Sequence, residues 1–228
     1  MLFGLSFFLG PSIWILVPAV ALAIYAQWKV RSTYRRYSRV PSASGLTAHG
    51  AARRLLEAEA ISDVTFEETK RALGDHYDPR KRILRLSGAA STSIAAIGVA
   101  AHEAGHAIQH ARGFGPLALR TAIVPIASFG SQLAFPLFFF GLIFRYQPLL
   151  TVGILLFSAA VLFTLVTLPV EFDASRRAVS ALRTSGLVNA EEIGAVKEVL
   201  FAAALTYIAA AAMAALQLLL LLSASRRR

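Results

Sequence analysis

The chain has 228 residues, of which 56% are hydrophobic and only 16% are charged, and its mean hydropathy is +0.59. A soluble domain carries roughly 25% charged residues, so this composition predicts a membrane protein with a modest extramembrane part. The absence of cysteine excludes disulfides, zinc ribbons and a thiol nucleophile. The net charge of +10 comes from Lys and Arg beside apolar segments, which argues against a nucleic-acid partner.

Four apolar segments are long enough to cross a bilayer, which takes about 20 helical residues. They cover residues 1–28, 117–144, 149–170 and 200–222. The first lacks the basic region of a cleavable signal peptide, so we expect it to be a retained anchor. Residues 1–228 are therefore expected to form one membrane domain.

A soluble segment of ordinary composition lies between the first two spans, over residues 29–116. Its caps and alternations predict two helices and three short strands. The elements are a helix capped by Thr47, strands over 63–68 and 76–86, and a helix from Ser91–Ser93 to Arg112. Asn189, with Glu192 in a capping box, begins a further helix within the linker 171–199 that runs into the last span.

Basic residues predict the orientation of the spans. Directly after the first span stand Lys29, Arg31, Arg35, Arg36 and Arg39. By the positive-inside rule this places residues 29–116 in the cytoplasm of a multi-pass protein of the cell membrane. Arg226–Arg228 would then lie outside, against the rule. We expect the first cluster to dominate, and the side of the C-terminus stays open.

The sequence His102-Glu103-Ala104-Gly105-His106 lies on the predicted helix that ends at Arg112. Residues four apart face the same side of a helix, so both imidazoles can bind one ion. Glu103 lies beside them, where it can accept a proton from a metal-activated water. This is the metallopeptidase logic of an H-E-x-x-H helix, so we expect one Zn²⁺ per chain.

A catalytic zinc needs a third protein ligand and an open position. His110 lies eight residues beyond His102, about 12 Å along the helix, which is too far to share the ion. His49 and His76 remain candidates, but each lies in an ordinary soluble context. Glu171 is the better candidate, because a carboxylate at the end of a membrane span is expensive and usually functional.

Topology also favours Glu171. Two predicted spans separate it from His106, so the chain crosses the membrane and returns to the side on which His106 lies. Asp173 is the alternative ligand; it points about 200° away from Glu171 on one helix, so both cannot bind together. A purely structural interpretation pairs Glu171 with Arg176 or Arg177.

The tracts VAAHEAGHAIQ, DHYDP and LPVEFDASRRA resemble those of the YugP-type membrane zinc metallopeptidases over essentially the whole chain. A more distant likeness is to the HtpX and CAAX-prenyl-protease group, whose second motif is E-x-x-A-D. That resemblance implies Glu171 as the third ligand of a gluzincin-like site. It also puts Ser175 where those relatives have Asp, so Ser175 or Asp173 is the expected outer partner of a ligand.

The expected fold is therefore mainly α, with about four transmembrane helices and a small α+β, zincin-like cytoplasmic insertion that carries the H-E-x-x-H helix. The expected reaction is peptide-bond hydrolysis with Glu103 as the general base. Candidates for stabilising the oxyanion are Tyr77, His76, Arg177 and Tyr207. The strand at Ile83–Leu86 is expected to offer an exposed edge to an extended substrate, or to be structural only.

The expected substrates are peptides or membrane proteins, and the lipid bilayer is the other partner. The alternative function is an inactive or regulatory membrane scaffold, although a scaffold needs neither His nor Glu103. A transporter would carry ionisable residues inside its spans, and the three later spans contain almost none. Cleavage specificity, oligomeric state and regulatory partners are left open.

Overall fold

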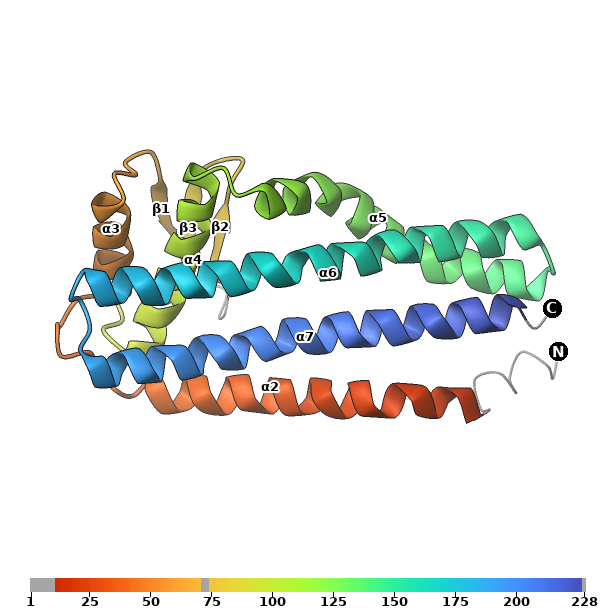
Figure 1. Cartoon of the computed structure of the whole chain (residues 1–228), viewed down its shortest axis with the longest axis horizontal. Coiled ribbons are helices and arrows are strands. Elements are labelled where there is room, and N and C mark those ends of the chain that lie inside the picture. The colour runs from red at the N-terminus through yellow and green to blue at the C-terminus, as the bar shows by residue number, and fades with distance from the viewer. Residues whose placement is uncertain (1–10, 71–73, 227–228) are drawn as a thin grey trace. The chain divides into compact units, whose positions relative to one another are not determined.

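The computed structural model describes residues 11–70 and 74–226. The chain divides into two compact units. The helical unit comprises Leu119–Leu168, Thr206–Arg228 and the described part of Met1–Ala26, and the mixed unit comprises Gln27–Ala118 and Pro169–Leu205. Figure 1 colours the elements in chain order.

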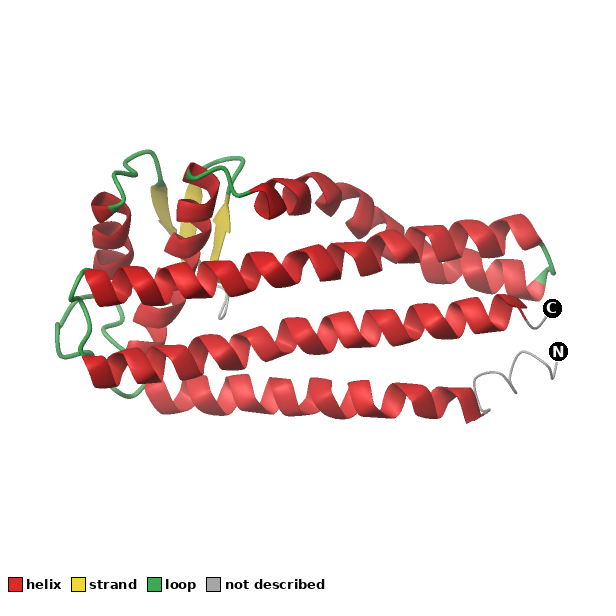
Figure 2. Cartoon of the chain, viewed as in Figure 1, coloured by secondary structure: helices red, strands yellow, loops and turns green. Residues whose placement is uncertain are grey.

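The mixed unit contains the predicted small α+β elements. They are α3 (Ala48–Ala58), β1 (Thr65–Glu68), β2 (His76–Asp78), β3 (Ile83–Leu86) and α4 (Ile94–Ala111). Thr47 caps α3 as expected, because its hydroxyl accepts a hydrogen bond from the amide of Gly50 at 3.0 Å. Figure 2 shows the three strands grouped beside α3 and α4.

The three strands form one sheet in the order β1-β3-β2. β3 pairs with β1 in parallel and with β2 in antiparallel register, with Tyr77 opposite Leu84. The expectation that Ile83–Leu86 offers an exposed edge is therefore wrong, because neighbouring strands occupy both of its edges. Leu84 and Leu86 are both buried, as expected for a central strand.

Helix α4 lies in the core of the mixed unit. Small residues such as Ala100, Ala101 and Ala104 are fully buried and let the neighbouring elements approach closely. Around them pack larger side chains from α3, β3, α6 (Gln147–Thr184) and α7 (Ala190–Arg226): Leu55, Leu56, Leu84, Leu182 and Val196. The burial fixes α4 as a rigid element, which is what a site carried on that helix requires.

The N-terminus of α7 (Ala190–Arg226) confirms the predicted capping box. The Glu192 amide donates to Asn189 Oδ1 at 2.9 Å, and the Asn189 amide donates to Glu192 Oε2 at 2.8 Å. The other carboxylate oxygen of Glu192 accepts a hydrogen bond from the Ala43 amide. Glu192 therefore joins the start of α7 to the segment before α3.

Three helices among the described residues are long and apolar enough to cross a membrane: α5 (Gly115–Ile143), α6 (Gln147–Thr184) and α7. They correspond to the second, third and fourth predicted spans. The first predicted span begins in residues 1–10, outside the described residues, and continues through a 3₁₀ helix (Pro11–Leu16) into α2 (Val17–Tyr37). The described residues thus contain three helices that could cross a membrane, by length and composition, and the fourth span stays a prediction.

The predicted end of the third span does not coincide with the end of a helix. α6 continues without interruption from Gln147 to Thr184. Glu171 therefore lies inside α6 rather than in a linker after it, and its backbone is held by the helix on both sides.

Candidate metal centre

His102 and His106 lie one turn apart on α4, with their ring centroids 4.8 Å apart. Ser93 caps this helix, because its hydroxyl accepts a hydrogen bond from the Ala96 amide at 3.3 Å. The His106 side chain is buried, whereas that of His102 remains 14% exposed. The spacing thus places both imidazoles on one side of the helix, as the sequence predicted.

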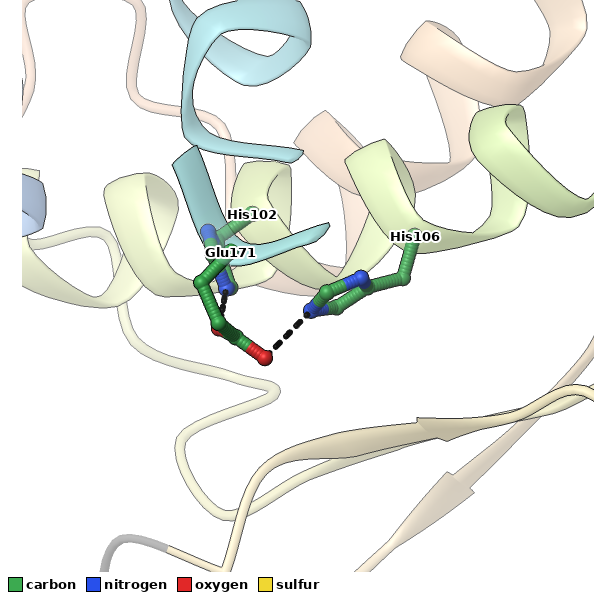
Figure 3. Close-up of side chains that lie close together, drawn as sticks. All are labelled: His102, His106 and Glu171. Atoms are coloured by element: carbon green, nitrogen blue, oxygen red, sulfur yellow. Dashed lines mark hydrogen bonds and ion pairs between the residues drawn. The ribbon is translucent and has the colours of Figure 1, made fainter. Parts of the chain in front are cut away.

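Glu171 on α6 faces the two imidazoles, as Figure 3 shows. Its Oε2 lies 3.1 Å from Nε2 of His102, and its Oε1 lies 3.7 Å from Nε2 of His106. One donor atom from each of the three residues lies within 4.8 Å of the other two. The structure therefore brings the three predicted ligands together, with the Glu171 side chain only 3% exposed.

Gly105 explains how α6 comes close enough to α4. A Cβ at this position would clash with the carbonyl oxygen of Ala174 and lie 3.1 Å from its carbonyl carbon. Only glycine permits this backbone approach, and the approach puts Glu171 within reach of the histidines. Sequence reasoning assigned no role to Gly105, because that role appears only where the two helices pack.

The buried amide of Gln109 orients His106. Gln109 Nε2 donates to the Val170 carbonyl at 2.8 Å and to Asp173 Oδ2 at 2.9 Å. Both partners are acceptors, so the oxygen Oε1 faces His106 and accepts from Nδ1 at 3.0 Å. The Nε2 of His106 is left facing Glu171. Sequence reasoning missed Gln109; its only signal was a position three residues after His106, on the same helix face.

Ser175 contacts Nδ1 of His102, as Gln109 contacts Nδ1 of His106. Its hydroxyl lies 3.1 Å from Nδ1 of His102. Asp173 contacts Gln109 and forms ion pairs with Arg177 at 2.5 Å and Arg176 at 3.5 Å. The two residues expected as outer partners thus serve different histidines, Ser175 directly and Asp173 through Gln109. The arginines pair with Asp173, while Glu171 lies against the imidazoles.

Glu103 is buried beside the two histidines and is held by β2. Its Oε2 accepts a hydrogen bond from the Tyr77 amide at 2.8 Å. The amide fixes the carboxylate from the side of the sheet, since Tyr77 belongs to an edge strand packed on α4. Glu103 therefore has a defined position, although it is not one of the three residues whose donor atoms converge.

The carboxylates give the centre a negative potential. Burial acts to lower the pKa of His106, but Glu171 and Glu103 beside it act to raise it, and the net shift of this pKa is upward. The same negative surroundings that favour a proton on His106 favour a metal cation. Two nitrogen donors and one carboxylate oxygen fit zinc with an open position.

The remaining predicted residues contact other partners. His76 is exposed: its Nδ1 donates to the Gly74 carbonyl and its Nε2 accepts from Arg85. His49 stacks on Phe66, with centroids 4.6 Å apart. The Tyr77 hydroxyl lies 2.9 Å from Nδ1 of His110.

Arg177 lies over the Phe114 ring, with its guanidinium carbon 5.7 Å from the ring centroid. Tyr207 belongs to the helical unit. The assignment of an oxyanion donor among Tyr77, His76, Arg177 and Tyr207 stays a prediction.

The chain is 44% identical to a Bacillus subtilis (strain 168) protein named "Putative membrane protease YugP", over 209 residues that cover 91% of this chain and 93% of that relative. No solved structure matches the chain. Residues 12–226 match the family described as "Putative neutral zinc metallopeptidase", and the chain belongs to that family.

Proposed function

We propose that this protein is an integral-membrane zinc endopeptidase in which His102, His106 and Glu171 hold one zinc ion and Glu103 is the general base. The observation that carries the proposal is the convergence of the three donor atoms within 4.8 Å. The family supplies the metal and the reaction class. The site supplies the residues proposed to bind the metal and to carry out the reaction.

The donors and their surroundings fit a zinc ligand set. Gln109 and Ser175 each contact the Nδ1 of one histidine, so the two Nε2 atoms are the nitrogens that face Glu171. An outer hydrogen bond of this kind fixes the tautomer and the ring direction of a ligating histidine. Zinc held there supplies Lewis-acid polarisation of the peptide carbonyl and a lowered pKa of the attacking water.

Glu103 performs the proton transfers in the proposed reaction. Its carboxylate accepts a proton from the water that attacks the peptide carbonyl carbon. It then donates this proton to the amine nitrogen as the carbon–nitrogen bond breaks, so the proton balance closes. The Tyr77 amide holds one carboxylate oxygen throughout, which leaves the other oxygen to exchange the proton.

We further propose that the chain is one multi-pass domain of the cell membrane, with four spans and a zincin-like mixed unit facing the cytoplasm. The basic residues that follow the first span support this orientation. Glu171 lies in the same helix as an apolar span, which supports substrates cut close to the bilayer, such as segments of membrane proteins.

Metal analysis combined with peptide cleavage tests the proposed function. The purified full-length protein should contain one zinc and cleave unfolded peptides. Glu103→Gln should retain the zinc and lose about 10²-fold or more in turnover, because it removes the base and leaves the ligands. His102→Ala and His106→Ala should lose both, whereas His49→Ala should lose neither, since His49 stacks on Phe66. A protein that binds zinc but shows no cleavage dependent on Glu103 would instead be a scaffold.

A further inference from the structure

The second half of α2 is positively charged and follows a long uncharged stretch of the chain. Residues 1–28 contain no charged side chain, and the first acidic residue of the sequence is Glu57. Residues 29–39 contain the five basic residues Lys29, Arg31, Arg35, Arg36 and Arg39. An apolar segment and a purely positive one therefore follow each other directly, and α2 continues through the change as one helix to Tyr37.

Trp28, Arg31 and Arg35 lie on one side of this helix. Successive residues of an α-helix are rotated by about 100°, so the directions of these three fall within an arc of about 60°. All three are exposed, and Trp28 is 61% exposed. Arg35 lies about 10 Å beyond Trp28 along the helix axis. This face of α2 thus presents an indole followed, one and two turns later, by two guanidinium groups.

The opposite side of α2 is packed against the mixed unit. Thr33, which points about 160° away from Arg31, is only 5% exposed. The Tyr37 hydroxyl donates to Glu198 Oε2 on α7 at 2.9 Å, and the Tyr37 side chain packs against the core around α4. The two arginines therefore project from a helix whose orientation is fixed by packing.

The guanidinium groups of this face are available to a ligand. Within the part of the chain that the structure describes, neither Arg31 nor Arg35 forms an ion pair. Arg36 differs, because its guanidinium carbon lies over the Tyr37 ring, 5.2 Å from the centroid. Guanidinium groups bind phosphate through paired hydrogen bonds. Two arginines one turn apart therefore favour a phosphate, and a tryptophan one turn before them is typical of the boundary between hydrocarbon and water.

We propose that Trp28, Arg31 and Arg35 form a binding face for the headgroup of an anionic phospholipid. The indole lies at the edge of the hydrocarbon, and the two guanidinium groups beyond it contact the phosphate. A phosphatidylcholine headgroup carries the same phosphate with a quaternary ammonium, which the arginines repel, so the face prefers anionic lipid. The inference rests on the proposed first span and does not depend on the peptidase reaction.

Quenching of Trp28 by brominated lipids tests the face in the full-length protein. The chain has two tryptophans, so Trp14→Phe leaves Trp28 as the reporter. This variant is placed in a bilayer of phosphatidylcholine and phosphatidylglycerol, with bromine on the acyl chains of one lipid or the other. A basic residue near an anionic surface strengthens binding about 5-fold. Phosphatidylglycerol should therefore be preferred beside Trp28, by up to about 30-fold for two arginines.

Two double variants in the same background make the test specific. Arg31→Gln with Arg35→Gln should abolish most of the preference. Arg54→Gln with Lys81→Gln is the matched control, because it removes two exposed positive charges elsewhere in the mixed unit. The control should keep the preference. Added salt should weaken the preference while both arginines are present, since salt screens exposed charges.

The outcomes separate the headgroup site from the membrane placement on which it rests. Equal quenching by the two brominated lipids keeps Trp28 at the bilayer and overturns the site. Quenching by neither lipid removes the placement of α2, and the site with it. An equal loss in both double variants shows a response to net charge alone, and competition by inorganic phosphate shows a site for the free anion. Either result overturns the lipid proposal. Cleavage dependent on Glu103 is measured separately, and its absence leaves the headgroup site standing.

Discussion

Oε1 of Gln109 lies 3.0 Å from Nδ1 of His106, and this contact decides which nitrogen of the imidazole faces Glu171. The amide cannot turn over, because its Nε2 donates to Val170 and Asp173. Gln109 is fully buried and uses its hydrogen-bonding groups within this network. It is a positioning residue: it acts on the proposed metal site through His106.

Replacing Gln109 with Leu should weaken zinc binding by about 10–100-fold, the usual cost of losing an outer partner of a ligand. The Val170 carbonyl and Asp173 also lose a donor, so the unfolding temperature should fall as well. Competition with a chromogenic chelator measures the affinity independently of activity. Gln27→Leu, at an exposed position of the mixed unit, is the control. Equal zinc affinity in both variants would show that Gln109 serves only packing.

The three candidates on α6 should differ in metal affinity. Glu171→Gln removes a direct ligand and should lose zinc most completely. Asp173→Asn weakens the support of Gln109, and Ser175→Ala removes one hydrogen bond to His102, so both should lose at most about 10–100-fold. Equilibrium dialysis against zinc ranks the three. If Asp173→Asn strips the metal while Glu171→Gln retains it, the third ligand is Asp173.

Gly105→Ala should separate α4 from α6. The added Cβ meets the Ala174 backbone, which cannot move as a flexible side chain can. We expect a loss of about 1–3 kcal/mol in the free energy of unfolding, together with weaker zinc binding. Gly194→Ala is the control, since nothing lies within 4 Å of a Cβ there. That variant should be neutral or stabilised by about 0.5–1 kcal/mol, because alanine favours a helix interior. Thermal unfolding with and without zinc compares the two, and equal behaviour would contradict the close-approach argument.

Single cysteines test the proposed orientation, since the natural chain has none. Ala58 and Gln147 are both exposed. In intact cells, Ala58→Cys should resist a membrane-impermeant thiol reagent, because the mixed unit is proposed to face the cytoplasm. Gln147→Cys should react, because it precedes the proposed third span on the outer side. After the cells are opened both should react, and the reverse pattern in intact cells would overturn the topology.

The sequence by itself determined the elements and the first part of the site. Local signals were sufficient to predict that Thr47, Ser93 and Asn189 cap their helices, because capping depends on neighbours within one turn. Helical periodicity placed His102 and His106 on one side of α4 for the same reason. The apolar runs identified three membrane-capable helices by length and composition alone.

Tertiary structure decided what depends on residues far apart in the chain. It made β3 a central strand, because strand order is set by pairing across the sheet and not by the alternation within one strand. It brought Glu171 to His102 across 69 residues through the close approach at Gly105, and it divided Asp173 and Ser175 between the two histidines. Gln109 acquires its role only where α4 and α6 meet, because its three hydrogen-bond partners come from both helices.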